Sequence, residues 1–180
     1  LSNVTLLGGV KEIGRSAFYQ CTWLNSIDLT RCDVERIGEY AFYGCLQLNS
    51  VNLGDDLVTL EDKAFYKCYT LKEIKLPDTL TSLGERAFYQ CAFMSKVEFG
   101  TGLDSISAYA FQGCTGLQEV VIPDNIKTIE KNAFYKCSNI QTITFGAGLK
   151  AIGDYAFYGA EGLTELYIPA NVTVGKYAFK

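Results

Sequence analysis

The sequence predicts a solenoid, a fold in which short repeats stack along one axis. The pair Ala-Phe recurs eight times, and the steps between successive pairs are 24 residues, then 23 five times, then 22. A fixed period of about 20 to 50 residues is typical of such folds. The chain of 180 residues is 48% hydrophobic and 20% charged, which is ordinary for a globular protein. We therefore expect residues 1–180 to form a single domain of nearly eight repeats of 22 to 24 residues.

Each repeat begins with residues that suit a short strand. Residues 71–76 (LKEIKL) end in alternating apolar and polar positions, which indicates a strand with one buried face. Equivalent strands of successive repeats are expected to pair in parallel at about 4.8 Å and to line one wall, the inner wall, as a single sheet. The period then places one apolar column in the core, namely Ile27, Val51, Ile74, Val97, Val120, Ile143 and Leu166.

A turn must follow each strand. Prolines stand at this position in one set of repeats, at Pro77, Pro123 and Pro169. Glycines stand there in the alternating set, at Gly54, Gly100 and Gly146. Both residues end strands, and their alternation indicates that the basic repeat was duplicated in pairs, which gives a longer period of 46 residues. The rest of each repeat returns along the opposite wall, where we expect irregular or short helical turns. A single repeat cannot enclose a core, so stability must come from stacking.

The repeated run L-x-x-I-x-L-P-x-x-L-x-x-I/L-G-x-x-A-F-x-x-C resembles the BspA-like class of leucine-rich repeats over the whole chain. The resemblance implies a curved right-handed solenoid, and bacterial or protist surface proteins that act in adhesion. It implies no particular ligand. The chain departs from the pattern at an extra residue near Cys32, a missing residue near Val174, and Ala160 in place of a cysteine. We expect these departures to change the register only locally.

Six of the seven cysteines occupy the same repeat position, three residues after Phe: Cys21, Cys45, Cys68, Cys91, Cys114 and Cys137. Side chains at stacked equivalent positions point the same way rather than at one another, so we expect reduced thiols that pack as small hydrophobic groups. Disulfides or a metal site remain alternatives. Zinc is disfavoured because the chain has no His and no close Cys-x-x-Cys pair. Cys32 lies outside the column and is expected to be the most reactive thiol.

Tyrosines form a second column directly after the Phe residues, at Tyr19, Tyr43, Tyr66, Tyr89, Tyr135 and Tyr158, with Gln112 as an interruption. We expect these rings to stack, partly buried, beside the core. A platform for carbohydrate or protein is the alternative.

The polar strand positions form two columns that face outward from the inner wall. The first runs Ser26, Ser50, Glu73, Lys96, Glu119, Thr142, Glu165. The second runs Asp28, Asn52, Lys75, Glu98, Val121, Thr144, Tyr167. Opposite charges on adjacent strands, such as Glu73 and Lys96, are expected to form cross-strand pairs of about 0.2 to 1 kcal/mol each. Candidate partner-binding residues are Val121 and Tyr167, which interrupt the polar wall, and Trp23 and Phe93, which precede the strands at one rim.

Asn3-Val-Thr5 and Asn171-Val-Thr173 match the glycosylation acceptor pattern, so Asn3 and Asn171 are candidate glycosylation sites if the source is a secreting eukaryote.

Composition disfavours several classes of function. The absence of His removes the common nucleophile arrangements and the commonest general base. The net charge of −4, with Lys and Arg scattered, disfavours nucleic acid. No apolar stretch approaches the roughly 20 residues that span a bilayer. We expect no catalytic, cofactor-binding or metal-binding residues and no membrane insertion.

These observations favour a non-catalytic binding module that contacts a protein, such as a host or matrix protein, through its concave face. Carbohydrate is a second possible partner. The alternative is a structural spacer, stalk or filament-forming array without a dedicated ligand. The chain begins at a strand leucine and stops at Phe179-Lys180, within a repeat. We therefore expect a fragment of a longer extracellular or cell-surface protein, whose uncapped terminal repeats are able to associate end to end.

Overall fold

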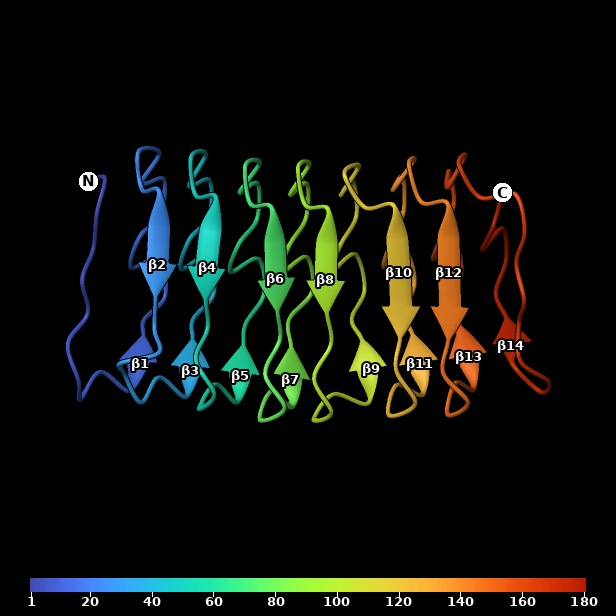
Figure 1. Cartoon of the computed structure of the whole chain (residues 1–180), viewed down its shortest axis with the longest axis horizontal. Coiled ribbons are helices and arrows are strands. Elements are labelled where there is room, and N and C mark those ends of the chain that lie inside the picture. Colours follow the sequence, from blue (N-terminus) through green and yellow to red (C-terminus); the bar gives the residue numbers. More distant parts are fainter.

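The computed structural model describes residues 1–180 and contains fourteen short strands and no helix. The repeats stand side by side along the long axis, with the two termini at opposite ends of the molecule (Figure 1). The predicted solenoid of parallel strands is confirmed. The return segments consist of irregular turns, so the short helical turns allowed by the sequence are absent.

The inner wall is formed by the longer strands, and the predicted apolar column lies behind them. These strands are β2 (Ser26–Asp28), β4 (Ser50–Asn52), β6 (Glu73–Lys75), β8 (Lys96–Glu98), β10 (Glu119–Ile122) and β12 (Thr142–Phe145). All pairs between them are parallel and in the predicted register. Five members of the column are buried: Ile27, Ile74, Val97, Val120 and Ile143. Val51 and Leu166 are only partly buried, and residues 164–167 do not form a strand.

The inner wall is not one continuous sheet but three hydrogen-bonded pairs, β2-β4, β6-β8 and β10-β12. Prolines lie at the interruptions. Across β10-β12, Gly146 N–H donates to the Ile122 carbonyl at 2.7 Å. The residue at the equivalent point is Pro123 between β8 and β10 and Pro77 between β4 and β6, and neither has an N–H to donate. The strand pairs therefore recur with the 46-residue unit of the sequence.

Glycine has the complementary role on the other strand of each pair. A Cβ atom added to Gly100 would lie 2.4 Å from the carbonyl oxygen of Pro77, and one on Gly146 would lie 2.5 Å from the carbonyl carbon of Pro123. Real Cβ atoms do not approach backbone so closely, because the interior is already close-packed. Proline and glycine turns therefore nest against each other within a pair.

A second set of parallel strands, two residues each, lines the next side of the solenoid and was not predicted. One sheet is β1 (Glu12–Ile13), β3 (Arg36–Ile37), β5 (Thr59–Leu60) and β7 (Ser82–Leu83). The other is β9 (Ser105–Ile106), β11 (Thr128–Ile129), β13 (Ala151–Ile152) and β14 (Thr173–Val174). Most of these strands bury their second residue. Figure 1 shows them below and beside the inner-wall strands.

The Ala-Phe turns form the outer wall and carry a third ladder of hydrogen bonds. In one repeat Phe88 N–H donates to the Ala110 carbonyl at 2.8 Å, and Gln90 N–H donates to the Gln112 carbonyl at 2.7 Å. This ladder requires left-handed backbone at Arg86 (φ 55°) and Gln90 (φ 56°). Such a conformation costs a residue other than Gly roughly 1–2 kcal/mol. The hydrogen bonds to the next repeat offset this cost.

A single hydrophobic core runs the length of the molecule. Apart from four glycines and Pro77, every buried residue is hydrophobic, and no polar or charged residue is buried. Phenylalanine rings form its axis from Phe18 to Phe179, with neighbouring centroids 4.9–5.4 Å apart and nearly parallel planes. Each repeat thus contributes one ring, and only a neighbouring repeat can cover it.

Candidate binding surfaces

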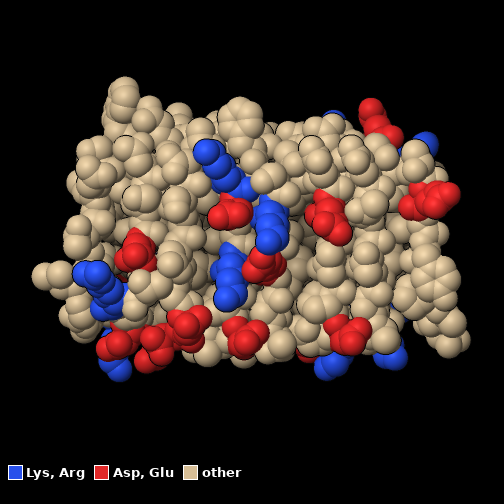
Figure 2. Space-filling model, viewed as in Figure 1, with Lys and Arg blue, Asp and Glu red and all other residues tan.

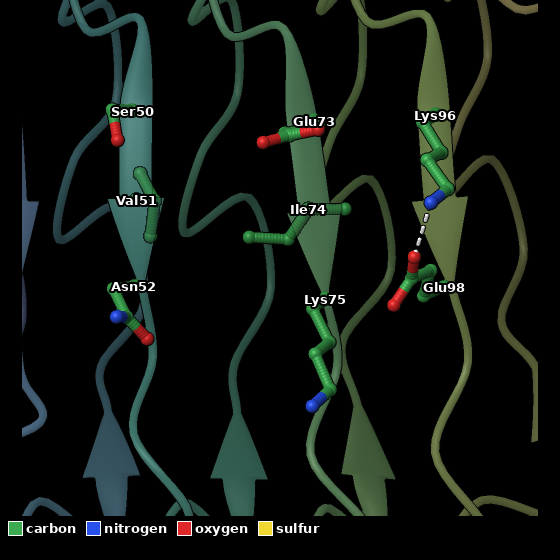
Figure 3. Close-up of a pocket in the computed structure, with 8 residues that line it drawn as sticks. All are labelled: Ser50, Val51, Asn52, Glu73, Ile74, Lys75, Lys96 and Glu98. Atoms are coloured by element: carbon green, nitrogen blue, oxygen red, sulfur yellow. Dashed lines mark ion pairs between the residues drawn. The ribbon is translucent and has the colours of Figure 1, made fainter.

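The centre of the inner wall is charged. Figure 2 shows Lys or Arg and Asp or Glu side chains gathered over β6 and β8, while the wall on either side is mostly uncharged. The strand register places Glu73 beside Lys96, and Lys75 beside Glu98. The ion pair that forms, however, joins Lys96 to Glu98 along the same strand (Figure 3). Side chains two residues apart on a strand lie on one face, which lets this pair meet. The predicted cross-strand neighbours form no direct ion pair. Their charges still attract: after the Lys96–Glu98 hydrogen bond, Glu73 and Glu119 help to raise the pKa of Lys96, and Lys75 helps to lower the pKa of Glu98.

This ion pair leaves two charges without an ionic partner. Hydrogen bonding from Lys96 lowers the pKa of the Glu98 carboxyl, and the same bond raises the pKa of Lys96. Glu73 and Lys75 form no ion pair. They border a shallow cavity of about 340 Å³ that Ser50 and Asn52 also line. This cavity lies where β4 and β6 are not hydrogen-bonded, and its side chains offer both donors and acceptors (Figure 3).

Acidic side chains follow the lower edge of the wall in Figure 2, where the turns after the strands lie. Two of them cap the next repeat: the Asp78 carboxylate accepts from Thr101 N–H at 2.8 Å, and Asp124 accepts from Ala147 N–H at 2.7 Å. The bond from Thr101 lowers the pKa of Asp78. Turn capping therefore accounts for these two carboxylates.

The C-terminal part of the inner wall presents the predicted apolar residues to solvent. The exposed fraction is 49% for Val121 and 82% for Tyr167. Val121 borders a hollow of about 540 Å³, and Tyr167 borders another of about 630 Å³. Both residues belong to one outward column, separated by Thr144 and hence by about 10 Å. They are exposed as predicted, and each lies beside a depression rather than on a flat surface.

The predicted rim residues are exposed as well, with 64% of Trp23 and 66% of Phe93 accessible. Phe93 borders a hollow of about 390 Å³ whose other lining residues are all polar. These lining residues are Asn25, Gln47, Asn49, Thr70 and Lys72. The amides were not singled out from the sequence, because Asn in such a position is also typical of turns.

The outer wall is occupied by its own contacts. The predicted tyrosine column is confirmed, with ring centroids 4.5–5.2 Å apart and the interruption at Gln112. A second group of tyrosines was missed, and it engages neighbouring cations. Lys63 Nζ donates to the Tyr40 hydroxyl at 2.8 Å, and the Arg86 guanidinium lies 4.2 Å from the Tyr109 ring centroid. In these contacts a Lys or Arg charge interacts with a tyrosine of the same wall, which stabilises both side chains.

The cysteines are free. In the column the thiol of one repeat donates to a Phe carbonyl of the preceding one, as from Cys68 to Phe42 at 3.2 Å. Burial raises the pKa of the Cys45 thiol to about 12, which makes thiolate chemistry there unfavourable. Cys32 is only 4% exposed, so the expectation that it is the most reactive thiol is not supported. Cys21, half-buried at the end of the column, is the accessible thiol.

No group of three or more His, Cys, Asp or Glu side chains is arranged to hold a metal ion. The structure has no helix with the length and hydrophobicity needed to cross a membrane. Asn3 and Asn171 are both exposed.

The repeat geometry agrees with comparison to known sequences. The BspA type leucine-rich repeat region matches residues 1–100 and 82–180. The chain belongs to the BspA type leucine-rich repeat family. No curated protein matches it.

Solved structures extend the comparison to the fold. A leucine-rich repeat protein of Treponema pallidum is 30% identical with a TM-score of 0.79, over 87% of this chain and 72% of that one. One from Bacteroides ovatus is 27% identical with a TM-score of 0.71, over 92% and 49%. A leucine-rich cell surface protein of Faecalibacterium prausnitzii is 23% identical with a TM-score of 0.63, over 95% and 52%. This BspA type chain thus spans about half the length of the latter two.

Proposed function

We propose that this BspA type solenoid is a non-catalytic interaction module of a cell-surface or secreted protein, and that it binds a protein partner through the C-terminal part of its inner wall. The observation that carries the proposal is the exposure of the Tyr167 ring beside a hollow, in a column that is otherwise mostly polar. An exposed aromatic ring offers a large contact area at a low entropic cost.

The charged centre of the wall is less suited to be the main contact. Docking there would strip water from Lys96 and Glu98, which already satisfy each other. Desolvation of Val121 and Tyr167 is favourable instead, since their exposed surface is largely apolar. The free Glu73 and Lys75 then act at the border of the interface, where charges set orientation and association rate.

The family supports a binding role on an extended surface, because a solenoid exposes side chains that vary without touching the core. The chain has no His to serve as a general base. The cell-surface location is supported by the description of the Faecalibacterium structure as a cell surface protein.

Photo-crosslinking tests this assignment. A photoreactive amino acid in place of Thr144, between Val121 and Tyr167 in their column, should capture the partner from host matrix extracts. The isolated partner is then titrated against Tyr167→Ala and Val121→Ser. Each variant should bind about fivefold more weakly or worse, which corresponds to the loss of about 1 kcal/mol typical of hot-spot truncation.

Tyr19→Ala is the matched control, since Tyr19 is an exposed ring on the outer wall. Normal binding by both inner-wall variants together with weak binding by the control would place the site on the outer wall. If the wild-type chain captured no partner at all, the spacer alternative would be favoured.

A further inference from the structure

The residues at the rim that precedes the inner-wall strands differ from one repeat to the next. One rim position lies two residues after each cysteine of the column, or after Ala160 in the last case, and holds Trp23, Gln47, Thr70, Phe93, Gly116, Asn139 and Gly162. Inter-repeat hydrogen bonds fix its backbone: Gln47 N–H donates to the Thr22 carbonyl at 3.2 Å, and Phe93 N–H to the Tyr69 carbonyl at 3.0 Å. Two exposed rings therefore stand three repeats apart, or about 14 Å. Short polar residues lie between them, and the C-terminal repeats have no ring at this position.

The hollow beside Phe93, which lies on the Trp23 side of that ring, is lined by three amides, Thr70 and Lys72. Asn25 and Asn49 hold equivalent positions, and Asn49 N–H donates to the Asn25 carbonyl at 2.9 Å. At the rim position itself, Thr70 and Asn139 use their side chains to bond the carbonyls of Leu46 and Thr115 in the preceding repeats. The side-chain amides of Asn25, Gln47 and Asn49 make no such bond and line the hollow beside Phe93. Their donors and acceptors remain available.

From this arrangement we propose that the rim between Trp23 and Phe93 binds a short oligosaccharide. A side-chain amide offers a donor and an acceptor together, which matches a pair of neighbouring sugar hydroxyls. The aromatic rings supply flat apolar surfaces on which the C–H groups of the terminal sugar units pack. Asn25 and Asn49 stand one repeat apart, about 4.8 Å, so they present amides to successive sugar units, and Gln47 adds a third amide beside Asn49.

A protein is a poorer match for this hollow. Protein hot spots are clustered apolar anchors in desolvated pockets, whereas the two rings here are separated by polar residues. The ammonium of Lys72 at the Phe93 end forms no ion pair and favours a carboxylate on the ligand. An acidic oligosaccharide is thus expected to bind more tightly than a neutral one. The proposal concerns a different surface from the Tyr167 site and does not depend on it.

Saturation-transfer NMR and calorimetry on the whole chain test the site, with chitotriose as the neutral probe and trigalacturonate as the acidic probe. Phe93→Ala and Asn49→Ala should each weaken binding of both probes about fivefold or more. Lys72→Gln should weaken only trigalacturonate. Tyr167→Ala is the matched control and should bind both probes normally. Thermal midpoints should remain unchanged, because these rim side chains are mostly exposed.

Four results would overturn the proposal. The first is no binding of either probe at millimolar concentration. The second is binding that Phe93→Ala and Asn49→Ala leave unaltered. The third is loss of probe binding in Tyr167→Ala, which would place the sugar on the inner wall. The fourth is loss of the protein partner in Phe93→Ala without any effect on the probes, which would make the rim a protein contact.

Discussion

The same repeat forms the outer wall and the inner wall, but the residues of the outer wall stay constant from repeat to repeat while those facing outward from the inner wall vary. On the outer wall the phenylalanine column runs without interruption, and the cysteine column fails only at Ala160. On the inner wall the outward positions range from Ser50 to Glu73 to Tyr167. Positions that touch the next repeat must match it, because stacking is the source of stability. Positions that face solvent are free to differ, and the candidate binding residues lie among them.

The adjacent residues Phe65 and Tyr66 put this contrast to its strongest test. Both rings stack on their neighbours at similar distances, but Phe65 is fully buried and Tyr66 only partly. Phe65→Ala should lower the free energy of unfolding by about 3–5 kcal/mol through lost burial and the cavity left behind. Tyr66→Ala should cost less, about 1–3 kcal/mol, because it removes two stacked pairs but leaves a smaller cavity. Urea unfolding of the two variants measures both, and equal losses would show that stacking rather than burial carries the stability.

The packing of proline and glycine turns predicts a somewhat smaller effect. Gly146→Ala forces a methyl group against the backbone of Pro123 and should cost about 1–3 kcal/mol, as overpacking does. Gly14→Ala is the control, because a Cβ there meets nothing within 4 Å. Hydrogen exchange should show faster opening across β10-β12 in Gly146→Ala. Unchanged protection of that pair would contradict the nesting of the two turns.

The buried thiols predict a dependence on alkaline pH. Burial raises the pKa of Cys91 well above its ordinary value, while the unfolded chain keeps a thiol pKa of about 8.5. The stability from this neutral thiol is fully present below about pH 8.5 and is lost as the pH rises toward the folded pKa, because only the unfolded state releases the proton. Each such thiol then lowers the free energy of unfolding by about 1.4 kcal/mol per pH unit.

Cys91→Ala removes one of these contributions, and Ala160 shows that the position accepts alanine. Urea unfolding at about pH 7.5 and about pH 10 measures the free energy of unfolding of both proteins. Relative to the wild type, the variant should be more stable at the higher pH than at the lower one. A constant difference between the two proteins would mean that the thiol ionises equally in the folded and unfolded states.

The sequence predicts those features of the fold that a pattern marks over many residues, and it does not predict those that depend on two or three residues. The period located the Phe, Tyr and Cys columns, and strand alternation placed Val121 and Tyr167 on the solvent side. Strands of two residues show no alternation, so the second set of strands could not be predicted from the sequence. The left-handed turns at Arg86 and Gln90 lack the glycine that would mark them. The Lys96–Glu98 pair depends on side-chain rotamers, which no periodic pattern specifies.

The tyrosine column offers the mildest test of the comparison, because its single gap can be closed. Gln112 lies between Tyr89 and Tyr135 in the column and is partly buried. Gln112→Tyr should add two stacked ring pairs and raise the free energy of unfolding by about 1 kcal/mol, since each pair contributes roughly 0.5–1.5 kcal/mol and ordering the new side chain offsets part of the gain. Gln112→Leu adds apolar surface without a ring and serves as the matched control. If the leucine variant is stabilised as much as the tyrosine variant, the column is stabilised by covered apolar area. If only tyrosine stabilises, ring stacking on the outer wall contributes beyond burial, and the half-exposed column differs from the phenylalanine column in degree rather than in kind.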